Sequence, residues 1–192
     1  MFAFCSKLTS INLYNFVTSN VITMSYMFAN CTSLTSINLL YFNTEKVQYM
    51  SNMFQYCLSL KYIDISNFNI INVKDLSSMF FFCKSLTSIN LSNFDIKNVN
   101  YMYEMFYYCS SLTSINLSHF NTKEVLSMRY MFYFCHNLEY IDISYFYIKI
   151  NPYIDNGDLF YDLPDYGTIK LNKESKDSIR RIPSGWSKII VN

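Results

Sequence analysis

The chain has 192 residues and a formal net charge of +1, and 51% of its residues are hydrophobic while only 15% are charged. This composition excludes an intrinsically disordered segment, which lacks the apolar surface needed to fold. It also argues against a nucleic-acid partner, because phosphate binding depends on massed lysine and arginine. No run approaches the roughly 20 apolar residues of a membrane-spanning helix, so we predict a folded protein that does not span a membrane.

Six cysteines divide most of the chain at a constant interval of 26 residues. They are Cys5, Cys31, Cys57, Cys83, Cys109 and Cys135. The surrounding residues repeat in phase, because a Met-Phe pair begins four residues before each cysteine. A unit of this size cannot enclose a core of its own, so each unit must bury its apolar face against the next. The period therefore predicts a solenoid of about six rungs over residues 1–146, the first one truncated.

Within each rung, two apolar patterns follow one another along the chain. Leu34-x-x-Ile37-x-Leu39 matches a leucine-rich-repeat pattern and predicts a short strand with Ile37 and Leu39 inward. The segment from Met50 to Cys57 has apolar residues at spacing i, i+3, i+4 and i+7, which predicts a helix of about two turns. Val47 could begin that helix or belong to a second short strand, and the spacing does not decide between them.

The two kinds of element differ in how closely they stack. Parallel strands lie about 4.8 Å apart, whereas packed helices need about 8–10 Å. We therefore expect an α/β solenoid that curves, with parallel strands on the concave face and short helices on the convex face. On the helix side, neighbouring cysteines should then be too far apart for disulfides, which need Cα atoms within about 7 Å.

The cysteine column has three interpretations. Zinc sites draw several ligands from a short stretch of sequence, which a 26-residue interval does not provide. Free cysteine is among the most buried residue types, so the column is best interpreted as core packing. Disulfides are the main alternative. We expect no metal and no cofactor.

A polar column on the predicted strands supplies candidate ligand-binding residues. Its members face outward beside the inward Ile and Leu residues, and they are interpreted either as a hydrogen-bonded amide ladder or as ligand contacts. Two tyrosines replace serine in a neighbouring column, and tyrosine is favoured in recognition surfaces. The predicted contacts on the concave face are Asn38, Tyr62, Asp64, Asn90, Asn116, His119, Tyr140 and Asp142.

No residue pattern indicates catalysis. His136 directly follows Cys135, but adjacent residues seldom face each other on a helix, and other rungs carry unrelated residues at this position. Asp64 and Asp142 lie three rungs apart without a base beside them, so they do not form an acid/base pair. We therefore expect a protein that is not an enzyme.

Residues 147–192 differ from the repeats and are predicted to form a degenerate rung and a C-terminal cap. All three Pro, all three Gly and the one Trp lie in this segment. Residues 159–163 and 168–171 echo the earlier rungs with a slip of two residues. A helix beginning at Asn172 or Ser175 and running to about Ile182, then a strand over residues 186–191, would complete the cap. The Met1 end has no matching cap, so it is predicted to self-associate.

The repeat unit carries a family resemblance. From Met79 to Met102 it reads Met-Phe-x-x-Cys-x-Ser-Leu-Thr-Ser-Ile-Asn-Leu-Ser-Asn-Phe-Asp-x-x-x-Val-x-x-Met. This unit resembles the BspA-like leucine-rich-repeat family of bacterial and protist surface proteins, and the match covers residues 1 to about 146. The chain departs from the family in carrying aromatic pairs before three cysteines, at Phe81-Phe82, Tyr107-Tyr108 and Tyr133-Phe134.

The resemblance implies a cell-surface or extracellular protein that adheres to host or matrix proteins. The residues from Met1 to Cys5 show no signal peptide, and the sequence begins within a repeat, so a cytoplasmic protein or a fragment is also consistent with it. We therefore expect a non-enzymatic repeat protein that binds another protein through its concave face. The alternative is a structural or self-associating fragment of a larger surface protein without a ligand of its own. An enzyme or metal site built on the cysteines is the weakest hypothesis.

Overall fold

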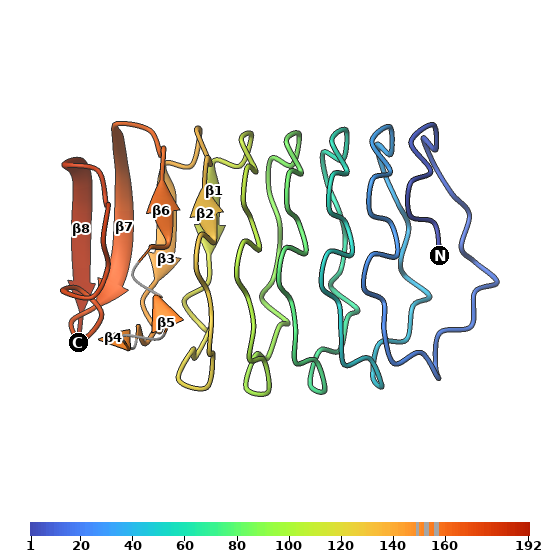
Figure 1. Cartoon of the computed structure of the whole chain (residues 1–192), viewed down its shortest axis with the longest axis horizontal. Coiled ribbons are helices and arrows are strands. Elements are labelled where there is room, and N and C mark those ends of the chain that lie inside the picture. The colour runs from blue at the N-terminus through green and yellow to red at the C-terminus, as the bar shows by residue number, and fades with distance from the viewer. Residues whose placement is uncertain (149, 152–153, 156–157) are drawn as a thin grey trace.

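The computed structural model describes residues 1–148, 150–151, 154–155 and 158–192. The chain winds into a row of stacked rungs with the two termini at opposite ends (Figure 1). In each rung, one segment contains the Met-Phe-x-x-Cys pattern, as in residues 24–31, and we call these segments the turn side. The next segment contains the Leu-x-x-Ile-x-Leu pattern, as in residues 34–39, and we call these the strand side. The predicted solenoid is therefore present.

Regular strands are concentrated toward the C-terminal end. A four-stranded parallel sheet on the strand side has the order β1-β3-β7-β8. Its strands are β1 (Ser114–Asn116), β3 (Tyr140–Ile143), β7 (Tyr166–Asn172) and β8 (Gly185–Val191). On the turn side, β2 (Phe132–Tyr133) pairs in parallel with β6 (Phe160–Tyr161). The antiparallel pair β4 (Ile150–Asn151) and β5 (Ile154–Asp155) lies between β3 and β6 in the chain.

The predicted helices on the convex face are wrong, because the described residues contain no helix. On the turn side, successive N–H groups bond alternately within the rung and between rungs. Met27 donates to the Met24 carbonyl three residues back, while Phe28 donates to the Met53 carbonyl of the next rung. Tyr26 and Asn30 adopt positive φ angles of 58° and 61°, which a right-handed helix does not allow. The helical spacing thus identified the buried side chains correctly and the backbone conformation incorrectly.

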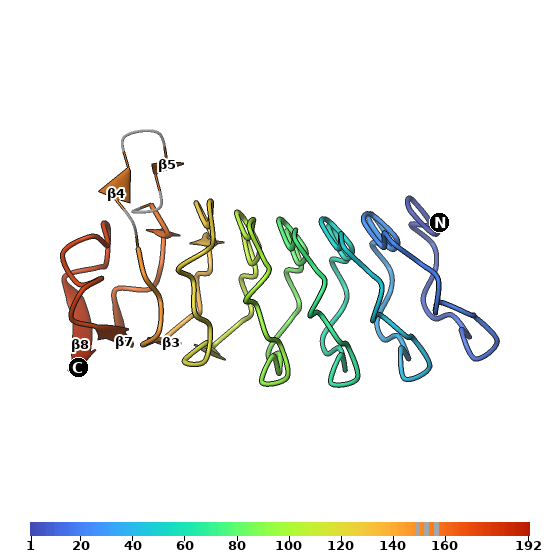
Figure 2. The ribbon, with the colours of Figure 1, turned by 90° about the horizontal axis from the view of Figure 1, so that it is seen from below.

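The predicted sense of curvature is also wrong, because the turn side is the more tightly joined of the two. Backbone bonds such as Met24 N–H to Tyr49 O, at 2.9 Å, link neighbouring rungs directly there. In Figure 2 the rungs lie closer together along the upper edge than along the lower edge, where β3, β7 and β8 are labelled. Without helices, the turn side does not need the 8–10 Å spacing of packed helices. The predicted strands therefore do not line a concave face.

Side chains fill the wider gaps between rungs on the strand side. Asn67 donates from Nδ2 to the carbonyls of Leu39 and Phe42 in the preceding rung, at 3.0 and 3.1 Å. The Thr44 hydroxyl donates to the Asn69 carbonyl at 2.9 Å and accepts from the Asn69 N–H at 2.8 Å. The same kind of bridge joins Thr122 to Tyr147, between the rungs of β1 and β3. The strands predicted for every rung appear only from β1 onward.

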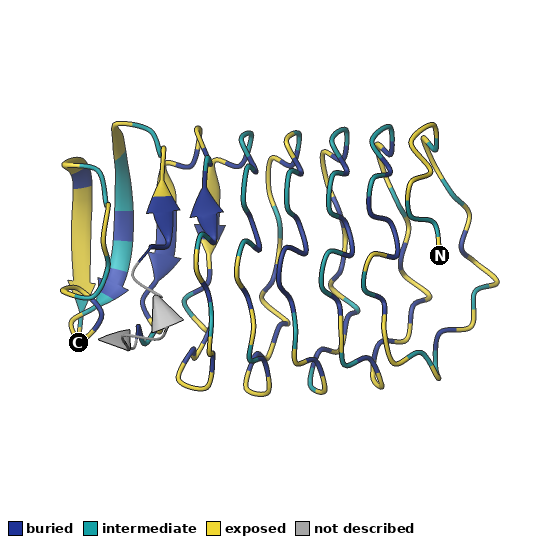
Figure 3. Ribbon diagram, in the orientation of Figure 1, coloured by how far each residue is buried: buried dark blue, intermediate teal, exposed yellow. Residues whose placement is uncertain are grey.

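One core runs along the interior of the whole stack (Figure 3). Its centre is a column of stacked phenylalanine rings whose neighbouring centroids are 5.5 to 5.9 Å apart. The column consists of Phe2, Phe28, Phe54, Phe80, Phe106, Phe132 and Phe160. Neighbouring rungs on the turn side are therefore close together, contrary to the wide spacing expected for a helical face.

The C-terminal segment continues the stack with the predicted slip of two residues. Phe132 pairs with Phe160, and Tyr140 pairs with Thr168, each 28 residues apart. The predicted helix from Asn172 or Ser175 to Ile182 is wrong: residues 173–178 form turns, and the Ser175 hydroxyl bonds to the Phe146 carbonyl at 2.5 Å. The predicted final strand is present as β8.

Two glycines allow the last strands to approach closely. A Cβ atom at Gly185 would lie 2.2 Å from the Asp165 carbonyl oxygen, and one at Gly167 would lie 2.7 Å from the Trp186 ring. Trp186 itself is buried and donates from Nε1 to the Pro164 carbonyl at 2.8 Å. Gly167 and Gly185 thus permit the tight packing that covers the end of the core.

None of the described residues form a helix with the length and apolar character needed to cross a membrane.

Candidate functional site

The predicted polar column on the strand side forms turns within each rung. In every member, the side-chain Oδ1 accepts a hydrogen bond from the backbone N–H two residues later, at 3.0 to 3.1 Å. These members are Asn38, Asp64, Asn90, Asn116 and Asp142. Asn and Asp favour such Asx turns because their short side chains reach the backbone. The expected amide ladder between rungs is therefore replaced by local turns, although the first four members stay exposed.

The two acidic members of this column have different surroundings. Hydrogen bonds from the Ser66 side chain and N–H hold the pKa of Asp64 below its usual value. Asp142 is buried, and its Oδ2 lies 3.3 Å from Lys170 Nζ in the adjacent strand β7. The β3–β7 register places these two residues side by side. Asp142 therefore has a charged partner within the fold, whereas Asp64 faces solvent.

Tyr62 and Tyr140 present large exposed surfaces on the strand side. Their exposed fractions are 58% and 37%. They lie three rungs apart, with Ser88 and Ser114 at the same position between them. The structure therefore places both tyrosines on one side of the solenoid without bringing their rings together.

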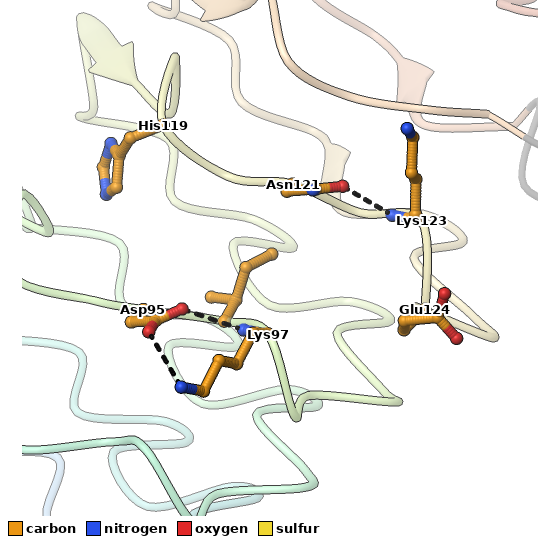
Figure 4. A pocket seen from close by; sticks show the side chains of 7 residues that line it. Asp95, Lys97, His119, Asn121, Lys123 and Glu124 are labelled. Atoms are coloured by element: carbon orange, nitrogen blue, oxygen red, sulfur yellow. Dashed lines mark hydrogen bonds and ion pairs between the residues drawn. The ribbon is translucent and has the colours of Figure 1, made fainter.

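His119 takes a structural position that asparagine occupies in the two preceding rungs. Its Nε2 lies 3.0 Å from the Leu91 carbonyl, as the Asn93 amide nitrogen lies 3.2 Å from the Ile65 carbonyl. The ring also borders an open depression of about 260 Å³ together with Asp95, Lys97 and Glu124. Figure 4 shows Asp95 directed at Lys97, with His119 apart from both. His119 is thus an inter-rung bridge at the rim of a shallow polar depression.

Five of the six cysteines lie in the core, as predicted. Cys31, Cys57, Cys83, Cys109 and Cys135 are fully buried, while Cys5 is exposed, and all six are free. Each buried thiol donates to a phenylalanine carbonyl of the preceding rung at 3.1 to 3.3 Å. Burial raises the pKa of all five, that of Cys135 to about 12. A buried protonated thiol is a poor nucleophile.

His136 and Cys135 do not form a catalytic pair. His136 Nε2 lies 2.9 Å from Asp162 Oδ2 at the surface, whereas the Cys135 thiol bonds to the Phe106 carbonyl inside the core. In the described part of the chain, no three His, Cys, Asp or Glu side chains are grouped so that they could hold a metal ion.

A cluster of aromatic residues on the turn side was not predicted as a site. Its rings lie immediately before the cysteines or beside them, and contacts with centroid distances of 4.5 to 6.2 Å connect them. We call it the aromatic patch: Tyr56, Phe81, Phe82, Tyr107, Tyr108, Tyr130, Tyr133, Phe134 and Tyr161. All of its members except Tyr133 and Tyr161 are half-buried. Tyr133 is buried, and Tyr161 is 47% exposed.

Two ring columns form the centre of the patch. Phe81, Tyr107 and Tyr133 stack along one column at 4.9 and 6.0 Å. Phe82 and Tyr108 stack in the second at 4.5 Å. The aromatic pairs before three cysteines were the signal in the sequence, but adjacent residues on the expected helix would have pointed in different directions. In the hydrogen-bonded ladder of the turn side, the two residues before each cysteine instead lie directly beside their equivalents in the next rung, so their rings align in two columns.

The sequence matches the model of a protein family described as "Mycoplasma protein of unknown function, DUF285", over residues 1–90 and 57–162. These matches cover most of the repeats. The chain belongs to this family. The second match extends past residue 146, where we predicted the solenoid to end, and the BspA-like name remains our interpretation of the repeat motif.

A crystal structure of a Treponema pallidum leucine-rich-repeat protein is similar to the DUF285 chain, with 17% sequence identity and a TM-score of 0.40. The match covers 79% of this chain, which spans 66% of the length of that structure. A search of curated proteins found no match.

Proposed function

We propose that this DUF285 chain is a non-enzymatic module that binds another protein through its strand side. The observation that carries the proposal is the exposure of Tyr62 and Tyr140 at a position where other rungs have serine. Serine at the same position satisfies the fold, so the tyrosines are not needed for packing. Exposed tyrosine supplies a large contact area at low conformational cost, which favours recognition.

The surroundings of these tyrosines support a broad and shallow contact surface. Asn38, Asp64, Asn90 and Asn116 are exposed on the same side, and their turns are rigidly held by hydrogen bonds to the backbone. A surface whose polar groups are fixed before binding loses less entropy when a partner docks. Solenoids commonly use such extended faces for protein recognition.

The BspA-like resemblance supports adhesion to a host or matrix protein as the biological role, and a cell-surface location with it. An antibody against the chain should label intact, unpermeabilised cells if the protein is displayed. Labelling that appears only after permeabilisation would contradict this location.

The binding proposal can be tested with immobilised matrix proteins, namely fibronectin, laminin and collagen. Wild-type chain should bind at least one of them, and the double variant Tyr62→Ser and Tyr140→Ser should bind about tenfold more weakly or less. The control variant is Tyr49→Ser, which removes another exposed tyrosine from the turn side. Equal loss in both variants, or no binding by the wild-type chain, would contradict the proposed strand-side function.

A further inference from the structure

The aromatic patch is not required by the fold. The two ring positions before the cysteine are occupied by Phe81 and Phe82 in one rung and by Ala29 and Asn30 in another, with the same backbone path. In both rungs the second residue donates its N–H to the next rung, at 2.7 Å for both Phe82 and Asn30. The stack therefore forms with or without aromatic side chains at these positions.

Five of the rings occupy a backbone conformation that disfavours them. Phe82, Tyr108 and Phe134 each have a φ angle of 59°, and Tyr56 and Tyr130 have φ angles of 57° and 60°. Bulky residues are uncommon in this left-handed region, whereas asparagine is enriched there. Asn30, at φ 61°, shows the residue type that this position accepts readily. Aromatic residues recur here in consecutive rungs despite the backbone cost, and such strain is typical of functional surfaces.

Charges of both signs border the patch. Asp158 and Asp162 are paired with Arg181 and His136, and Glu104 accepts a hydrogen bond from the Ser78 hydroxyl.

The two cations that remain among the described residues of the patch, Lys84 and Arg129, indicate the chemistry of the binding partner. Lys84 Nζ lies 5.4 Å from the centre of the Phe82 ring and 5.0 Å from that of Tyr108, and it pairs with no carboxylate among the described residues. The Arg129 guanidinium lies 4.3 Å from the Tyr130 ring centre and hydrogen-bonds to the Tyr130 hydroxyl. Stacked rings cover one another's faces and leave their electropositive edges for a partner. Apolar side chains next to carboxylates would complement this surface.

We propose that the aromatic patch is a docking surface for an acidic segment of another protein that carries apolar side chains beside its carboxylates. The inference extends the proposed protein-binding function to the turn side, and it depends on none of the strand-side residues. Carboxylates of the segment would pair with Lys84 and Arg129, while its apolar side chains would pack against the ring edges. Cations already held over aromatic rings keep a fixed position for such pairing.

The test uses two labelled peptides of equal length. In the first, Glu and Asp alternate with Leu and Phe, and in the second, Lys and Arg replace the acidic residues. Fluorescence polarisation should show that the wild-type chain binds the acidic peptide at least about tenfold more tightly than the basic one. The triple variant Phe82→Asn, Tyr108→Asn and Phe134→Asn should lose this binding by about tenfold or more. It should still fold, because asparagine suits the left-handed positions.

Substitutions of Lys84 test the contribution of charge to peptide binding, and a strand-side variant tests whether the two surfaces bind independently. Lys84→Glu should reverse the preference toward the basic peptide, whereas Lys84→Ser, which copies Ser110 of the next rung, should weaken acidic binding without reversal. The variant Tyr62→Ser and Tyr140→Ser should bind the acidic peptide normally. Loss of matrix-protein binding in that variant, with peptide binding retained, would support both proposals independently. Peptide binding without any matrix-protein binding would overturn the proposed strand-side function alone.

Other occupants of the patch would give different results. Equal binding of the two peptides, or acidic binding that survives the triple substitution, would overturn the proposal. Sedimentation velocity and phosphatidylserine vesicles test a second copy and a lipid surface. The proposal would also be overturned if the wild-type chain did not bind the acidic peptide but self-associated or bound vesicles, and the triple variant abolished that association.

Discussion

The buried cysteines stabilise the stack as hydrogen-bond donors as well as apolar side chains. The Cys83 thiol donates to the Phe54 carbonyl at 3.2 Å, and that carbonyl also accepts from the Cys57 N–H at 3.0 Å. The thiol therefore forms a hydrogen bond to the preceding rung, and its acceptor is a carbonyl that already closes a turn in that rung. This contact requires a small donor that tolerates burial, a combination that cysteine provides.

The thiols also make stability depend on pH. Burial raises the pKa of Cys83 far above the ordinary value of 9.0, which the unfolded thiol should have. Above about pH 9 the unfolded state releases this proton while the folded state keeps it, so the free energy of unfolding falls as pH rises. Below pH 9 both states hold the proton, and the contribution is fully present.

We predict that Cys83→Ala makes this decline shallower by up to about 1.4 kcal/mol per pH unit between pH 9 and 11. Urea denaturation at several pH values measures the slope. The exposed Cys5 supplies the control, because Cys5→Ala should leave the slope unchanged. Identical slopes for wild type and Cys83→Ala would show that the buried thiol does not govern alkaline stability.

At the scale of the element, the turn side is defined by its left-handed residues. In each rung from the second to the sixth, two positions adopt positive φ, illustrated by Asn52 at 59° and Tyr56 at 57°. They allow alternate N–H groups to bond within the rung and to the next rung. The apolar residues at i, i+3, i+4 and i+7 still reach the core, which explains why the helix prediction found Met53 and Phe54 as buried residues.

Substitutions at Asn52 should distinguish this conformation from a helix. Asn52→Ala should lower the free energy of unfolding by about 1 kcal/mol, because alanine is strained at positive φ. Asn52→Gly should be nearly neutral. In a helix the order would be reversed, since alanine is the better helix former. Thermal or urea unfolding of the two variants measures the difference.

The whole molecule behaves as a row of units that each contact only their neighbours. Such arrays need not lose all rungs together, because stability is a sum of rung and interface contributions. Trp186 lies in the last strand of the stack and is the only tryptophan in the chain. Its fluorescence therefore reports the C-terminal end, while circular dichroism reports every rung.

We predict that in Gly185→Ala the C-terminal end of the stack unfolds at a lower denaturant concentration than the other rungs. The added Cβ would meet the Asp165 carbonyl at 2.2 Å, a backbone clash that only displacement of β8 relieves. We expect Trp186 fluorescence to shift to the red and its denaturation midpoint to fall below that of circular dichroism. Coincident midpoints in this variant would show that the array unfolds as one cooperative unit. Ser187→Ala, in the same strand at an exposed position, is the matched control.

Much of the architecture could be predicted because it repeats. The period set by the cysteines identified the rungs, and the slip of two residues identified the pairing of Phe132 with Phe160. The sequence also predicted correctly that Asn38, Asp64 and Tyr62 are exposed on the same side of the stack. Their Asx turns could not be foreseen, because each depends on the backbone path of its own rung.

The sequence by itself determined which side chains are buried and how the rungs follow one another, since a repeated apolar pattern must align its columns to exclude water. Only the tertiary structure decided the conformation between Met50 and Cys57 and the stacking of Phe82 on Tyr108. The reason is that half of the N–H groups on the turn side find their acceptors about 25 residues away, in the next rung. A local helical pattern contains no information about such partners, so it cannot distinguish a helix from a ladder of turns.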